Sequence, residues 1–173
     1  MGRFWLSHQD EVDTVEDMGE KVPVEVHSTL NLGLDIRIPP EYITDEHQRL
    51  RAYKRIADAA TVEQGDELLA ELEDRYGPAP DAVRYLLKFS VLKTNAQKLG
   101  IEAIDRRQGV LNVKFHQEAR VDPNRLMDLV RDTEGAQFTP AGVLRIPLDG
   151  ASNAAKVLDL LEARLVQLQP KHA

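Results

Sequence analysis

Apolar side chains recur at helical spacing in three successive stretches between residues 41 and 101. Apolar residues three or four positions apart lie on one face of a helix, so each stretch predicts an amphipathic helix. The predicted helices span residues 45–59, 61–77 and 80–99. Thr44 and Thr61 are placed to cap the first two, while Gly77 and Gly100 end the second and third. The residues expected to face the core on the first two helices are Leu50, Tyr53, Ile56, Ala57, Val62, Leu68, Leu69, Leu72 and Tyr76.

Apolar and polar residues alternate, with a period of two, on either side of the three helices. This pattern is typical of half-buried strands. It covers residues 22–26, 32–38, 101–105, 110–115 and 143–146. A short helix over 122–132, with Met127 facing inward, and a final helix over 153–169 complete the pattern. The order predicts an α+β fold, in which an N-terminal helical half of three consecutive helices precedes a small β-sheet with packed helices.

Composition narrows the chemistry open to the chain. The sequence has no cysteine, which excludes disulfides, thiolate zinc sites and cysteine nucleophiles and fits a cytoplasmic location. It has no phosphate-binding glycine loop, and its five histidines lack metal-ligand spacing, so we expect no cofactor and no metal. No run approaches the roughly 18 apolar residues of a membrane helix. Carboxylates are too numerous for a catalytic pair to be identified, and we expect no catalysis by this chain.

Glu71, Asp74 and Arg75 are the candidate partner-binding residues. Their i, i+3, i+4 spacing places them on one face of the second helix. An exposed Glu71–Arg75 ion pair would explain Arg75, which also suits the last turn of a helix. It would leave Asp74 unexplained, because an acid near a helix C-terminus faces the negative end of the helix dipole. A cation supplied by a partner would explain Asp74, and an ordinary solvated face is the alternative.

Arg51, Lys54 and Arg55 form a basic stripe on the first helix. The stripe is either a solvated helix face, since acidic residues lie beside it, or a secondary contact with phosphate or an acidic partner. A nucleic-acid-binding module would use these three together with Lys88, Lys93 and Lys98. The net charge of −7 argues against that alternative, because duplex binding needs a clearly basic surface.

The order of motifs between Tyr42 and Ile101 resembles the C-terminal (TRCF) domain of bacterial transcription-repair coupling factor (Mfd). The first motif, Tyr-Ile-x-Asp-x-x-x-Arg-Leu-x-x-Tyr-Lys-Arg-Ile-Ala, begins at Tyr42. The second, Glu-Leu-x-Asp-Arg-Tyr-Gly-Pro-x-Pro, begins at Glu71, and Leu-Gly-Ile follows at 99–101. The resemblance covers roughly residues 30–168, so we expect the domain over 30–169. Residues 1–29 are expected to be a linker or tail of unknown role, in which Phe4, Trp5 and Leu6 form the strongest apolar cluster.

The resemblance implies a regulatory part of a larger machine. The family's full-length protein is an ATP-driven DNA translocase that displaces stalled RNA polymerase and recruits the excision-repair protein UvrA. Its C-terminal domain lacks the motor, docks on a UvrB-like module of the same polypeptide and masks the surface that UvrA would bind. The resemblance thus predicts a non-catalytic, autoinhibitory interaction domain in transcription-coupled nucleotide-excision repair, with ATP, DNA and polymerase bound elsewhere in the parent protein. It places the docking surface on the face that carries Glu71, Asp74 and Arg75.

Overall fold

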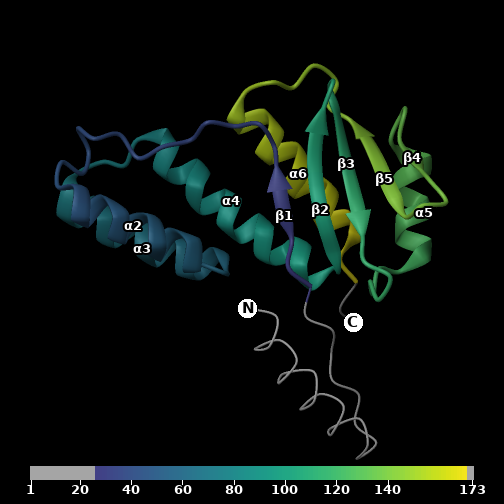
Figure 1. Ribbon diagram of the computed structural model, residues 1–173, viewed down its shortest axis with the longest axis horizontal. Helices are drawn as coiled ribbons and strands as arrows, with labels where there is room; N and C mark the ends of the chain where they lie inside the picture. Colours follow the sequence, from purple (N-terminus) through teal and green to yellow (C-terminus); the bar gives the residue numbers. More distant parts are fainter. Residues whose placement is uncertain (1–25, 171–173) are drawn as a thin grey trace, which may run out of the picture.

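Two halves that share one long helix make up the computed structural model, which describes residues 26–170 (Figure 1). The helical half consists of α2 (Glu46–Asp58), α3 (Val62–Tyr76) and α4 (Asp81–Lys98). The other half is a five-stranded sheet with α5 (Pro123–Asp132) and α6 (Ala154–Leu168). The predicted α+β class is confirmed. The strand expected over 22–26 lies outside the described residues, apart from Val26, which is not in a strand.

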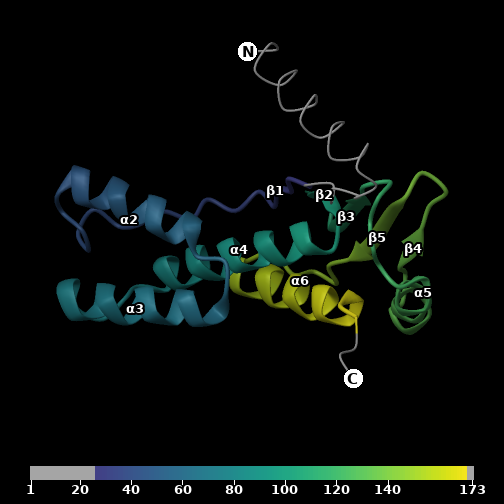
Figure 2. The ribbon, with the colours of Figure 1, turned by 90° about the horizontal axis from the view of Figure 1, so that it is seen from below.

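The sheet has the strand order β1-β2-β3-β5-β4. Its strands are β1 (Thr29–Asn31), β2 (Ile101–Arg107), β3 (Val110–Phe115), β4 (Gln137–Phe138) and β5 (Val143–Pro147). β1 runs parallel to β2, and the other neighbours are antiparallel. Helices α4 and α6 lie against one face (Figure 2). Facing residues on the opposite side form a polar row across all five strands: Asn31, Asp105, Asn112, Arg145 and Gln137.

Two hydrophobic cores, one in each half, meet along α4. Val83 and Leu87, in its first half, belong to the core shared with α2 and α3. Leu92 and Ala96, further along, belong to the core under the sheet, which α6 completes with five buried residues. Apolar residues wrap much of the circumference of α4, so the helix can be buried by different partners at its two ends. α4 therefore sets where the helical half sits relative to the sheet.

Local signals decide where the helices begin and end. Asp45, rather than the predicted Thr44, caps α2, because its carboxylate accepts hydrogen bonds from the backbone N–H groups of residues 47 and 48. Thr61 caps α3 as predicted, and its hydroxyl accepts from the N–H of Gln64 at 3.1 Å. Gly77 and Gly100 follow α3 and α4 with φ of 91° and 77°, a conformation that a side chain disfavours.

The strand predicted over residues 32–38 is wrong, since this segment pairs with no other part of the described chain. Leu32 is buried in the core under the sheet, and Ile38 is buried in the core of the helical half. Leu34 and Ile36 between them are partly buried and face Leu86 and Phe89 of α4 across a shallow groove. The alternation therefore arises from packing along α4, and not from strand pairing.

Four residues expected to face the core are exposed instead. Leu50, Val62 and Met127 keep 59%, 56% and 61% of their surface, and Ala57 is exposed as well. Each lies on a helix that is covered on one side only, so a narrow face is buried. On α2 that face consists of Ala52 and Ile56.

Candidate docking surface

An acidic stripe runs along the exposed side of α3. Glu63, Glu67, Glu71 and Asp74 follow one another at spacings of four, four and three residues, and all four are exposed. Residues at these spacings share one face of a helix, and we call these four the α3 acidic stripe. Glu63 and Glu67 were not among the predicted site residues, although their i, i+4 spacing to Glu71 was visible in the sequence. Carboxylates in line repel one another, so the stripe is complementary to a basic surface.

Glu71 is bound to the neighbouring helix. The guanidinium of Arg55 on α2 donates two hydrogen bonds to its carboxylate, with 3.1 Å between Nη2 and Oε1 for the second. The hydrogen bonds from Arg55 lower the pKa of Glu71 and raise that of Arg55. The expected Glu71–Arg75 ion pair is absent among residues 26–170. Two of the predicted site residues are therefore joined across α2 and α3, in a pairing that sequence spacing did not indicate.

Asp74 and Arg75 keep their charged groups available. Both are exposed, and within residues 26–170 no hydrogen bond or ion pair engages the Asp74 carboxylate. The Arg75 guanidinium lies 5.9 Å from the centre of the Tyr76 ring, within the range of a cation–π contact. The Tyr76 hydroxyl in turn donates to Oε1 of Gln48 at 2.9 Å, which ties the end of α3 to α2. Asp74 thus lies in the last turn of α3 without a compensating charge.

The turn between α3 and α4 is held by the side chains of Tyr42, Glu73 and Arg84. The Tyr42 hydroxyl donates to the carbonyl of Gly77 at 2.8 Å. Glu73 Oε2 accepts from the N–H of Ala79 at 2.9 Å and from Nη2 of Arg84 at 3.1 Å. Burial, with the nearby charge of Glu73 as a second cause, raises the pKa of Tyr42. These residues support the fold of the site.

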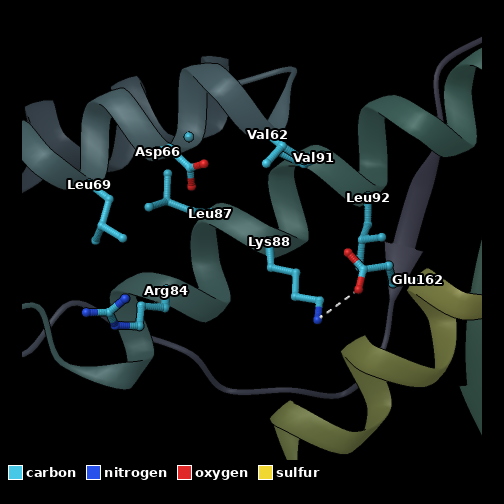
Figure 3. A pocket seen from close by; sticks show the side chains of 10 residues that line it. Val62, Asp66, Leu69, Arg84, Leu87, Lys88, Val91, Leu92 and Glu162 are labelled. Atoms are coloured by element: carbon cyan, nitrogen blue, oxygen red, sulfur yellow. Dashed lines mark ion pairs between the residues drawn. The ribbon is translucent and has the colours of Figure 1, made fainter.

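The six basic residues considered for nucleic-acid binding fall into two groups, those that are exposed and those that form ion pairs. Arg51, Lys54, Lys93 and Lys98 are exposed. Arg55 is occupied by Glu71, and Lys88 bridges α4 to Asp159 and Glu162 of α6. Figure 3 shows the pair between Lys88 and Glu162. Burial opposes the charge of Lys88, but the hydrogen bonds to these two carboxylates outweigh it and raise its pKa. Two of the six candidate cations are therefore already neutralised.

Among residues 26–170, no group of three or more His, Asp or Glu side chains is placed to hold a metal ion. Within that range, every helix is too short or too polar to cross a bilayer.

Comparison with known proteins gives a consistent match. A family model described as the TRCF domain matches residues 32–126. The transcription-repair-coupling factor of Myxococcus xanthus is 32% identical over 126 residues, which are 72% of this chain and 10% of that protein. The Escherichia coli K12 protein of the same name is 37% identical over 102 residues, which are 59% of this chain and 9% of that protein. The chain thus spans about a tenth of the length of these relatives.

A solved structure matches the fold. The crystal structure of a C-terminal domain of transcription-repair coupling factor superposes with a TM-score of 0.74. The match covers 84% of this chain and 94% of that chain, at 22% sequence identity. At this identity the likeness establishes the fold.

Proposed function

The chain belongs to the family of TRCF domains of transcription-repair coupling factors, and we propose that it is an autoinhibitory docking domain. A TRCF domain is a non-catalytic part of a DNA-repair protein. In this proposal the α3 acidic stripe binds a basic surface on the UvrB-like module of the parent protein and masks the surface that UvrA would bind. ATP, DNA and RNA polymerase are bound by other domains of the parent, in the cytoplasm, and this chain needs no cofactor of its own.

Asp74 is the observation that carries the proposal. It is exposed, it has no partner within residues 26–170, and it lies two residues before the end of α3. An acid at that position costs roughly 0.3–1 kcal/mol against the helix dipole. A cation on a docked partner would turn this unfavourable position into an attractive one, and the neighbouring carboxylates would extend the contact along the stripe.

A masking contact must also be able to open. Interfaces between domains of one chain bury about 600–1,500 Å² and are more polar than permanent ones. Tethering supplies an effective concentration on the order of millimolar, so a contact with a Kd of about 1 μM in trans would be closed about a thousandfold in cis. Opening it would then cost about 4 kcal/mol, which a competing partner such as polymerase can supply.

The alternative, a nucleic-acid-binding module, is less well supported. Its basic surface loses Arg55 to Glu71 and Lys88 to Asp159 and Glu162. Non-specific duplex binding needs a continuous set of phosphate contacts, and the four cations that stay exposed are spread over α2 and α4. The acidic stripe on α3 would repel the same ligand.

Calorimetric titration of this chain with the isolated UvrB-like module tests the proposal. We expect binding that weakens about tenfold or more on Asp74→Lys, because a charged contact is replaced by a repulsive one. Asp58→Lys is the matched control, since Asp58 is an exposed acid at the end of α2 and lies outside the stripe. Absence of binding by the wild-type chain, or equal loss from both variants, would contradict the proposal.

A further inference from the structure

A groove between α3, α4 and α6 is left unused by the proposed docking surface (Figure 3). Its volume is about 270 Å³, and its apolar lining consists of Val62, Leu69, Leu87, Val91 and Leu92, with Gly65 beside them. Val62 forms part of this lining and keeps 56% of its surface exposed. The volume is below the roughly 300–1,000 Å³ of most small-molecule pockets, so the groove suits one or two large side chains.

The charge around the groove is negative. Arg84 and Lys88 are its two cations, and both are neutralised: Arg84 by Glu73, and Lys88 by the carboxylates of α6. Asp66 also lines the groove and is exposed, and within residues 26–170 it has no ion pair or hydrogen bond. A ligand that combines large apolar side chains with a positive charge is therefore complementary to this site.

We propose that residues 3–6 of the same chain, Arg-Phe-Trp-Leu, dock on this groove, with Trp5 among the one or two large side chains that enter it. Phe4, Trp5 and Leu6 are three large apolar side chains in a row, within a segment that lies outside the described residues and that the docking function does not use. An aromatic side chain of this size buries about 150–250 Å² when it is covered. Arg3 precedes them, and residues 1–9 contain no Asp or Glu. This stretch therefore carries a positive charge that can pair with Asp66.

The connection is long enough to permit this docking. The chain from Leu6 to Thr29, where β1 begins, has 23 residue steps, and an extended chain reaches about 3.3 Å per residue, or up to about 75 Å. The 18 residues of α4 rise about 1.5 Å each, which makes that helix about 27 Å long. The groove lies along the middle of α4, at Leu87 to Leu92, and is therefore within reach of the segment.

Trp5 is the single tryptophan of the chain and reports directly on this docking. Its fluorescence should be measured in the complete chain, with acrylamide as the quencher and N-acetyltryptophanamide as the exposed reference. We expect a blue-shifted emission and a quenching constant severalfold below that of the reference. Emission and quenching equal to those of the reference would overturn the proposal.

Substitutions at the rim identify where Trp5 is covered. Val62→Lys and Asp66→Lys both change exposed groove residues, place a positive charge near Arg3, and should return Trp5 to reference-like quenching. Val166→Lys is the matched control, because Val166 has the same 56% exposure as Val62 but does not line the groove. Circular dichroism confirms that each variant is folded.

Three further results would each overturn the assignment. Trp5 that stays protected in both groove variants would be covered elsewhere. Trp5 that is released equally by Val166→Lys would be covered by a surface other than this groove. Protection that appears only at concentrations where sedimentation detects a dimer would mean that a second copy supplies the contact.

Discussion

Arg55 of α2 donates a hydrogen bond to each carboxylate oxygen of Glu71 on α3. The two helices lie side by side (Figure 2), and this pair fixes the position of the α3 acidic stripe relative to α2. Glu71 therefore ties the stripe to α2, while the exposed Asp74 carboxylate makes no ion pair within residues 26–170. Because Arg55 neutralises Glu71, only three of the four carboxylates in the stripe keep an uncompensated charge. This limits the repulsion between them.

The first prediction concerns the pH dependence of this pair. Because Arg55 lowers the pKa of Glu71 below its ordinary value of 4.5, the stabilisation is present above that value and is lost as pH falls through the folded-state pKa. We expect Glu71→Gln to lower the melting temperature at neutral pH, and the difference from wild type to shrink below about pH 4.5. Thermal melts at pH 7 and pH 3 would measure it.

Glu67→Gln is the control for this prediction, because Glu67 is an exposed member of the same stripe one turn away and has no ion pair within residues 26–170. Its replacement should not lower the melting temperature at pH 7, because it removes a carboxylate that the neighbouring carboxylates of the stripe repel. A difference between wild type and Glu71→Gln that stays constant at all pH values would mean that the ion pair contributes nothing.

The second prediction concerns the Tyr42 hydroxyl, which donates to the carbonyl of Gly77 at the turn between α3 and α4. Tyr42→Phe should destabilise the domain by about 1 kcal/mol, the usual net value of such a hydrogen bond. For a chain of this size the melting temperature should fall by about 2–4 °C. Tyr85→Phe is the comparison, since Tyr85 is also half-buried but its hydroxyl makes no hydrogen bond within residues 26–170. Equal losses from the two variants would contradict the assignment.

The third prediction concerns Gly100, which follows α4 with φ of 77°. A Cβ there would lie 2.7 Å from the Cα of Ala119, which is closer than real contacts allow. Gly100→Ala should lower the free energy of unfolding for two reasons. Overpacking against Ala119 should cost roughly 1–3 kcal/mol, and the left-handed backbone conformation should cost a residue with a side chain roughly 1–2 kcal/mol more. Gly150→Ala has similar φ and open space, so it should show the strain alone. Denaturant titration of both variants measures the difference, and equal stabilities would show that the close approach relaxes freely.

The fourth prediction concerns DNA. With a net charge of −7 and two of its six candidate cations neutralised, the chain should bind duplex DNA no more tightly than the roughly 10⁻⁴–10⁻⁶ M of non-specific binding. Fluorescence anisotropy at several salt concentrations would measure both affinity and salt dependence. Submicromolar binding at physiological salt, with a steep salt slope, would favour the nucleic-acid-binding alternative.

The helices could be predicted because their signals are local. Thr61 caps α3 with its own side chain, and Gly100 ends α4 through its own backbone, so neither depends on distant parts of the chain. The segment 32–38 could not be predicted correctly, because alternate burial against α4 produces the same period-two pattern as a strand. β4 was missed, since its two residues are too few for any pattern.

Part of the candidate site could also be predicted, because the spacing of residues along one helix is a local signal. Helical spacing placed Glu71 and Asp74 on one exposed face, as the structure has them. The bond from Arg55 to Glu71 depends on how α2 packs beside α3, which no spacing within α3 can reveal. The exposure of Val62 depends likewise on how α3, α4 and α6 are arranged around it, so the groove it lines appeared only with the structure.

UvrA binding by the full-length parent protein tests the central claim most directly. Breaking one partner of a close charged contact typically costs about 2–5 kcal/mol, which is comparable to the closure energy of about 4 kcal/mol. We therefore predict that Asp74→Lys raises UvrA binding at least tenfold over wild type, with the melting temperature of the isolated domain unchanged, while Asp58→Lys stays masked. UvrA binding at the wild-type level in Asp74→Lys, together with a large loss of melting temperature, would show that Asp74 is a structural residue and that this face does not dock.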